Sequence, residues 1–212
     1  QPRGRFEWLL AAATLGCLAL AWLWSLAPPY AFDALVYHLR QVTLYLTERS
    51  IFVPVDSAYA GFPALWQMLY AFTLGLSGES ASQLLHFACL PLTVLVAAAT
   101  GRRLWHIDLT WPIAALLTAV PTLLLVAAWP YVDVALIFYT SLLCYALVAW
   151  HQEGATRWLV LAGLMCGIAM EVKYTALWHP LAAAALILLS ARRCGVRATA
   201  SHLALFAGTT IV

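Results

Sequence analysis

Charged side chains are scarce in this chain of 212 residues. Asp, Glu, Lys and Arg together make up 9% of it, whereas hydrophobic residues make up 64%. This composition excludes an ordinary soluble domain and predicts an all-α polytopic membrane protein. The formal net charge is only +2, so the basic surface that a nucleic-acid partner requires is missing.

Motifs for metal binding and for common hydrolytic sites are also missing. The sequence has no CxxC, no HExxH, no Gly-rich phosphate loop and no Ser-His-Asp set. Its five cysteines are odd in number and four of them lie in apolar stretches, which favours free buried thiols over a zinc cluster. The spacing of these residues therefore predicts no zinc cluster.

Long apolar runs dominate the chain, and a transmembrane helix needs about 20 such residues. We expect a single transmembrane domain over residues 1–212, with the first span within 1–27, an external loop at 28–80 and a helix bundle at 81–212. The last span reaches Val212 incomplete and the chain begins at Gln1, which predicts a fragment or part of a longer protein. The predicted spans number about seven: Phe6–Ala27, Ala81–Gly101, Trp111–Ala128, Val132–Trp150, Trp158–Val172, Thr175–Ala191 and one beginning near Thr199.

The external loop is too long to be a simple connection and too apolar to be disordered. It is predicted to contain two amphipathic juxtamembrane helices, Asp33–Arg49 and Gly61–Leu76. In the first, Asp33, Tyr37 and Arg40 recur at helical spacing and share one face. In the second, a short run that contains Pro63 and Gln67 is typical of an interfacial or re-entrant helix rather than a span.

The distribution of Lys and Arg predicts the orientation. With a cytoplasmic N-terminus, eight of the eleven basic residues face inward, and Arg40, Arg49 and Lys173 face outward. If the run at 62–76 crossed the membrane and the N-terminus were outside, eight of the eleven Lys and Arg residues would again face inward. We favour the first arrangement because it also places the Arg3–Arg5 pair inside, among the inward residues Arg3, Arg5, Arg102, Arg103, Arg157, Arg192, Arg193 and Arg197.

Two of the carboxylates predicted at the outer surface are candidate catalytic acids. Asp33 opens the first juxtamembrane helix, where it could act as a helix N-cap or as a general base that deprotonates an acceptor hydroxyl. Asp133 opens a later span, where a helix N-terminus favours an acid. Together the two acids could hold a divalent metal or divide acid and base roles, and both alternatives stay open.

Lys173 lies at the outer end of the fifth predicted span and could either bind a lipid phosphate or extend to the interface as an anchor. Glu171 is a further candidate, because ionisable residues at membrane depth are often functional. Residues two apart do not share a helix face, so Glu171 and Lys173 are not expected to pair. His38 and His179 are outward candidates for which interfacial packing is the alternative.

Three segments resemble the GT-C superfamily of membrane glycosyltransferases, which use polyprenyl-phosphate sugars and include the protein mannosyltransferases and the lipid A aminoarabinose transferase. They are Asp-Ala-Leu-Val-Tyr-His-Leu-Arg at 33–40, Tyr-Val-Asp-Val-Ala-Leu at 131–136 and the Gly-rich run at 161–177 that contains Lys173. The first is similar to the family's loop with its catalytic acid, and the second to its second external acid. The third is similar to a span that ends in a lysine before an aromatic residue.

The resemblance implies a glycosyltransferase of the bacterial inner membrane, acting at its periplasmic face on a polyprenyl-phosphate sugar among membrane lipids. Asp33 and Asp133 would be the catalytic acids. Lys173, Arg40, Tyr37 and His38 would contact the lipid phosphate. The mannosyltransferases carry Asp-Glu at the first site, whereas Ala34 follows Asp33 here, and family members usually have eleven or more spans.

Two other functions compete with the enzyme. A non-catalytic membrane subunit, built on a truncated scaffold of this kind, would pack against partner helices through small residues such as Ala97–Ala99 and Ala182–Ala185. A transporter would instead need polar residues near mid-membrane and paired broken helices. The ionisable residues of this chain lie at the ends of the spans, which disfavours the transporter.

Overall fold

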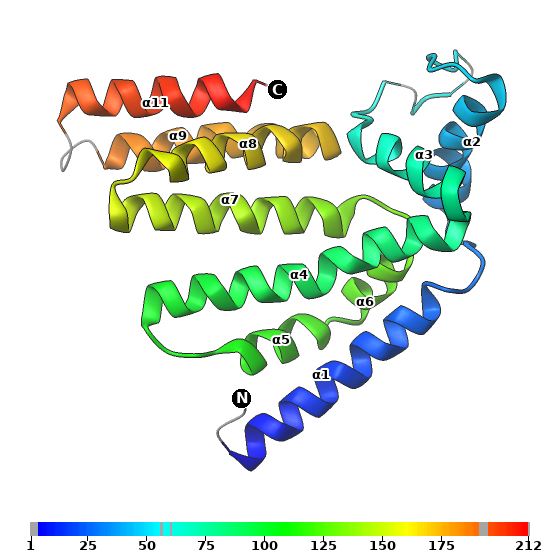
Figure 1. Ribbon diagram of the computed structural model, residues 1–212, viewed down its shortest axis with the longest axis horizontal. Coiled ribbons are helices and arrows are strands. Elements are labelled where there is room, and N and C mark those ends of the chain that lie inside the picture. Colours follow the sequence, from blue (N-terminus) through cyan, green and yellow to red (C-terminus); the bar gives the residue numbers. More distant parts are fainter. Residues whose placement is uncertain (1–3, 56, 60, 191–194, 212) are drawn as a thin grey trace.

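A computed structural model describes residues 4–55, 57–59, 61–190 and 195–211. The sequence-based assignments that involve Gln1, Arg3, Arg192, Arg193 and Val212 lie outside these residues. The described residues form helices and no strands. The helices of the bundle are stacked in one row, from α11 at one side to α1 at the other (Figure 1).

The first half of the chain contains α1 (Arg5–Trp24), a π-helix η1 (Ala34–His38), α2 (Leu39–Glu48), α3 (Leu65–Ser77) and α4 (Glu79–Trp105). The second half contains α5 (Thr110–Thr118), α6 (Pro121–Ala128), α7 (Asp133–Glu153), α8 (Thr156–Val172), a 3-10 helix η2 (Tyr174–Trp178), α9 (His179–Leu189) and α11 (Val196–Thr210). The all-α prediction is thus confirmed for the described residues.

Three helices, α1, α4 and α7, are long and apolar enough to cross a membrane. The pair α5 and α6 would count as a fourth span if the two are taken together. The described helices that follow α7 have 17 residues or fewer, so the count of seven spans stays a prediction.

The third predicted span is not one continuous helix. It is divided into α5 and α6, whose axes differ by 79°. Pro121 causes the break, because its ring disfavours helical geometry at the preceding residue and supplies no backbone N–H. Val120 is accordingly extended, with φ −87° and ψ 103°.

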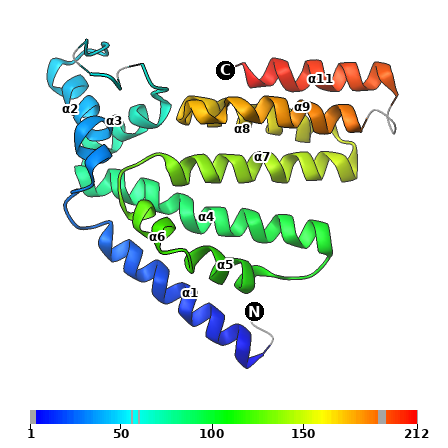
Figure 2. The same cartoon turned by 180° about the vertical axis from the view of Figure 1, so that it is seen from behind.

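Close packing of small residues joins the C-terminal helices to the bundle. The helix α7 lies between α4 and α8, and α11 packs on α8 (Figures 1 and 2). Gly163 of α8 allows this contact: a Cβ there would lie 1.9 Å from the Thr209 Oγ1 and 2.7 Å from the Phe206 carbonyl oxygen of α11. The two helices therefore cross at a distance that only glycine permits.

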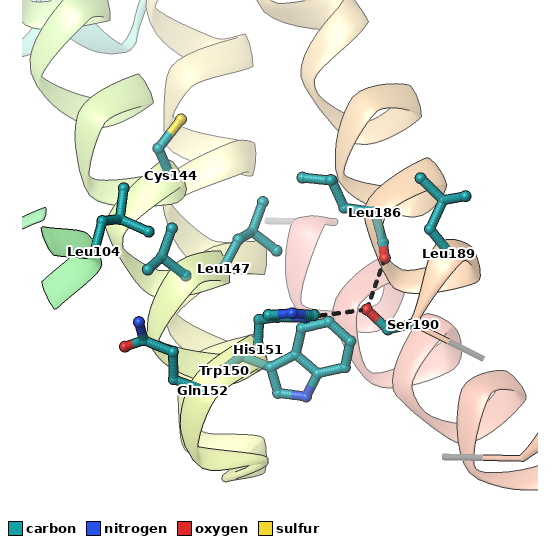
Figure 3. A pocket seen from close by; sticks show the side chains of 10 residues that line it. Leu104, Cys144, Leu147, Trp150, His151, Gln152, Leu186, Leu189 and Ser190 are labelled. Carbon is teal, nitrogen blue, oxygen red and sulfur yellow. Dashed lines mark hydrogen bonds between the residues drawn. The ribbon is translucent and has the colours of Figure 1, made fainter. Parts of the chain in front are cut away.

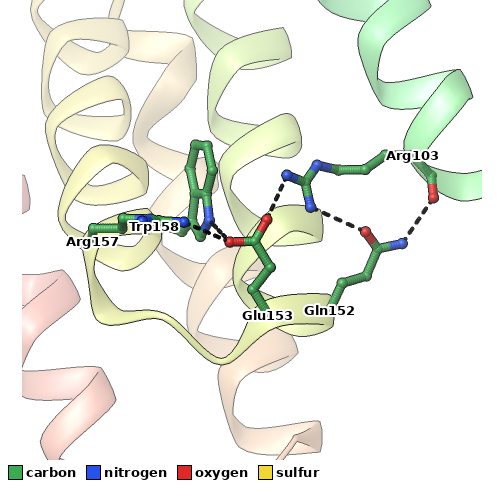
Figure 4. A network of polar contacts seen from close by, with 5 residues as sticks. All are labelled: Arg103, Gln152, Glu153, Arg157 and Trp158. Carbon is green, nitrogen blue, oxygen red and sulfur yellow. Dashed lines mark hydrogen bonds and ion pairs between the residues drawn. The ribbon is translucent and has the colours of Figure 1, made fainter.

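A polar network fastens α4, α7 and α8 at the end of the bundle where α4 and α7 finish (Figure 4). Arg103 donates to Glu153 at 2.6 Å and to Gln152 at 3.3 Å. The same Glu153 carboxylate accepts hydrogen bonds from Arg157 at 2.9 Å and from the Trp158 indole at 2.6 Å. One carboxylate thus holds three helices together.

The helices η1, α2 and α3 gather at the opposite end of the bundle (Figures 1 and 2). They occupy the two segments where juxtamembrane helices are predicted, and α3 is only 13 residues long. In α2 the side chains of Leu39 and Val42 are buried, whereas Leu46 of α2 and Leu35 of η1 are exposed. This end of the molecule also holds the start of α7 and the end of α8, which carry Asp133 and Lys173.

Candidate functional site

Asp33 immediately precedes the π-helix η1, and its carboxylate makes no capping hydrogen bond to that helix. The Asp33 Oδ2 instead accepts a hydrogen bond from the Tyr37 hydroxyl at 3.2 Å. Burial, followed by the charge of Asp33, raises the pKa of Tyr37, so the phenol keeps its proton and remains a donor. The N-cap alternative therefore has no hydrogen bond to support it, and the role of Asp33 as a general base stays a prediction.

Asp133 and Lys173 form an ion pair across two helices. The Lys173 Nζ lies 2.7 Å from the Asp133 Oδ1, and the two side chains are 33% and 40% exposed. Asp133 is the first residue of α7, where the helix dipole favours a negative charge. Lys173 follows α8 in an extended conformation, with φ −156° and ψ 132°, and this break directs its side chain away from the helix axis.

The connection between α6 and α7 is held by two buried residues that sequence reasoning did not single out. His86 of α4 accepts from the Val134 N–H at 3.1 Å through Nε2, and its Nδ1 lies 2.7 Å from the Trp129 carbonyl oxygen. The Tyr70 hydroxyl of α3 donates to the Tyr131 carbonyl oxygen. These bonds fix the backbone on both sides of Asp133. The sequence signal that points to such residues is a polar side chain within an apolar run.

The charges of Asp33 and Asp133 both affect the pKa of Tyr131. Burial raises the pKa of the Tyr131 phenol, a hydrogen bond with the Asp33 backbone lowers it, and the charges of Asp33 and Asp133 raise it. Two acids that lie a hundred residues apart in the sequence thus both influence one residue of the α6–α7 connection.

A pocket of about 190 Å³ opens between these groups. It reaches from Tyr37, which is bonded to Asp33, to Lys173, which is paired with Asp133. Aromatic rings, backbone turns and two buried polar side chains complete its lining: Tyr37, His38, Phe62, Pro63, Gln67, Val132, Val172, Lys173 and Tyr174.

The buried polar side chains are His38 and Gln67, which are 2% and 3% exposed. The Gln67 Nε2 lies 3.1 Å from the His38 Nδ1. Burial, followed by the charge of His86, lowers the pKa of His38 to about 3. His38 is therefore neutral at physiological pH and would contact a substrate through hydrogen bonds rather than through charge.

Three of the remaining predicted residues stand apart from this pocket. Arg40 is exposed and lines a separate recess beside Tyr37, together with Ser57. Glu171 is exposed near the end of α8 and does not line the pocket. The ring of His179 bonds Thr140 at 2.9 Å and the Ala176 carbonyl at 2.7 Å, which agrees with the packing alternative for that histidine.

A larger pocket, of about 430 Å³, lies at the opposite end of the bundle between α4, α7 and α9 (Figure 3). Its walls are mainly apolar, and His151 and Ser190 bond each other across it at 3.3 Å. No carboxylate or cation lines it among the described residues, so it offers less for group transfer than the smaller pocket.

A metal ion at the site would need several His, Cys, Asp or Glu side chains close together. Within the described ranges, no group of three or more His, Cys, Asp or Glu side chains is placed to hold a metal ion. Asp133 is already neutralised by Lys173. The residues present thus suit a site in which a lysine supplies the positive charge.

The helical fold and the long apolar helices fit an integral membrane protein. Residues 63–212 match the family described as dolichyl-phosphate-mannose-protein mannosyltransferase, and the chain belongs to this family. The match includes Asp133 and Lys173, whereas Asp33 precedes it. Searches of the curated proteins and of the solved structures found no match.

Proposed function

We propose that this chain transfers a sugar from a polyprenyl-phosphate donor to an acceptor hydroxyl at the end of the bundle that carries Asp33, Asp133 and Lys173. One observation carries the proposal. Two residues that line one pocket each bond a carboxylate from another position in the chain: Tyr37 bonds Asp33, and Lys173 pairs with Asp133. Asp133 and Lys173 lie in the region that matches the mannosyltransferase family.

The reaction needs few groups from the protein because the leaving group is already a phosphate. The acceptor oxygen attacks the anomeric carbon of the sugar, the bond from that carbon to the phosphate oxygen breaks, and polyprenyl phosphate leaves. Asp33 takes the proton of the acceptor hydroxyl. Lys173 offsets the charge on the departing phosphate, and Asp133 orients the ammonium group through their 2.7 Å contact.

We further propose that this end faces the periplasm of a bacterial inner membrane and that the N-terminus is cytoplasmic. Among the described basic residues, Arg5, Arg102, Arg103, Arg157 and Arg197 belong to the opposite end of the bundle. An excess of Lys and Arg on the cytoplasmic side supports this orientation.

The Asp33→Asn variant tests the assignment of the base. Transfer from a radiolabelled polyprenyl-phosphate sugar, measured with the purified chain in lipid nanodiscs, should fall about 100- to 10,000-fold, the usual contribution of a general base. Glu48→Gln, which changes an exposed acid of α2 in the same loop, is the matched control and should retain activity. Unchanged transfer by the Asp33→Asn variant would sink the assignment.

A further inference from the structure

The amide of Gln67 has an unused hydrogen-bonding group in the candidate pocket. Its Nε2 bonds to the His38 Nδ1, whereas its buried Oε1 has no partner among the described residues. Turning the amide over would leave the Nε2 unpartnered instead, so one polar end stays unused in either orientation. Buried polar groups nearly always have partners, so this open group, which lies in the lining of a pocket, is available to a ligand.

The surroundings of Gln67 suit a neutral hydroxyl rather than a phosphate. When the Gln67 Nε2 donates to the His38 Nδ1, the neutral imidazole carries its proton on Nε2. The bottom of the pocket thus combines an amide with an uncharged ring. The charged group of the lining, Lys173, is paired with Asp133 and is 33% exposed, on the solvent-accessible side.

Aromatic rings form a wall beside these polar groups. The ring of Phe62 lies 5.5 Å from that of Tyr174 and 6.2 Å from that of Tyr37. Aromatic faces carry partial negative charge and attract the weakly positive C–H bonds of an apolar ligand face. A pocket of about 190 Å³ with such a wall fits one sugar ring and is too small for a polyprenyl chain.

We propose that Gln67 is a specificity-determining residue that bonds a hydroxyl of the transferred sugar ring, while the wall formed by Tyr37, Phe62 and Tyr174 contacts the face of that ring. This inference rests on the proposed function and adds to it the separation of two subsites. The sugar lies against Gln67 and His38, and the phosphate lies at Lys173.

A binding comparison isolates the contribution of the sugar. The full chain in nanodiscs is titrated with dolichyl-phosphate mannose, dolichyl-phosphate glucose and sugar-free dolichyl phosphate. Gln67→Met should weaken the preferred glycosylated lipid about 5- to 100-fold, the range for a lost hydrogen bond of a buried group, and leave the sugar-free lipid unchanged. Gln41→Met, which replaces another buried glutamine of this loop, should preserve both affinities.

A second measurement uses the unmodified protein, so a folding defect in the variant cannot obscure the result. Deoxy analogues of the preferred lipid each lack one hydroxyl of the sugar. One of these analogues should bind the unmodified chain more weakly than the full lipid does, by about the same factor as the Gln67→Met substitution costs. That deoxy analogue and the full lipid should bind the Gln67→Met variant with equal affinity. Equal binding of every deoxy analogue to the unmodified chain would refute the inference, as would an unchanged sugar preference in Gln67→Met.

The two proposals fail in distinguishable ways. If none of the three lipids binds the unmodified chain, the proposed function fails and the inference falls with it. If the lipids bind and the sugar preference is independent of Gln67, only the sugar subsite is wrong. In that case a trapped water molecule satisfies the Gln67 amide.

Discussion

Replacing His86 with leucine should loosen the segment that carries Asp133. The imidazole is 0% exposed and serves two helix ends at once, since its Nε2 accepts from the Val134 N–H of α7 and its Nδ1 donates to the Trp129 carbonyl after α6. The first N–H groups of a helix have no partner within the helix, so this side chain from α4 caps α7.

The size of the effect follows from the groups left unsatisfied. A buried polar group that loses its partner costs about 1–3 kcal/mol. The Val134 N–H is fully buried and the Trp129 carbonyl only partly, so the two losses together should destabilise the fold by roughly 2–5 kcal/mol. Leucine has nearly the volume of histidine, and the loss of packing should therefore be small.

The free energy of unfolding can be measured by SDS titration of the purified chain in mixed micelles. His86→Gln is the matched variant, because glutamine supplies an acceptor and a donor and should restore part of the stability. Equal unfolding curves for the unmodified chain and for His86→Leu would show that the two hydrogen bonds contribute nothing, and the account of how Asp133 is positioned would be refuted.

Lys173→Met should weaken binding of sugar-free dolichyl phosphate about 10-fold or more, since charge-assisted hydrogen bonds contribute about 1.5–3 kcal/mol. Arg49→Met, at an exposed cation of the same end, should leave this affinity unchanged, and equal affinities of the two variants would contradict the role of Lys173. Gly163→Ala should lower the midpoint of thermal unfolding, because the new Cβ would lie 2.7 Å from the Phe206 carbonyl. Gly208→Ala, where a Cβ meets no atom within 4 Å, is its control, and equal midpoints would show that the α8–α11 crossing tolerates a side chain.

Much of the architecture follows from hydrophobic run length. The start and end of α4 and α7 are close to the predicted limits, because a continuous apolar run bounded by polar residues leaves little choice. The division of α5 from α6 was missed, although Pro121 marks the position where the helix breaks. The length of the apolar run predicts one span, whereas the proline within it divides the run into two helices.

The candidate site divides in the same way. Asp33, Asp133 and Lys173 are conspicuous because ionisable residues are rare in a chain with 9% charge. Their pairing could not be read from the sequence, since Asp133 and Lys173 are 40 residues apart and meet only because α7 packs against α8. In the sequence, Gln67 indicates only that its apolar run is not a transmembrane span. Its contact with His38 depends on how α3 lies against η1.

The π-helix between Asp33 and α2 determines how this segment would respond to the deletion of one residue. Its wide turn, closed by the Leu39 N–H on the Ala34 carbonyl, accommodates one residue more than an α-helical turn would. Deleting a single residue within 34–38 would therefore let the segment continue as regular α-helix and keep α2 packed through Val42. Asp33 would then rotate about 100° around the helix axis. A one-codon deletion could thus uncouple the acid from its pocket without removing any of the residues that line it on the other helices.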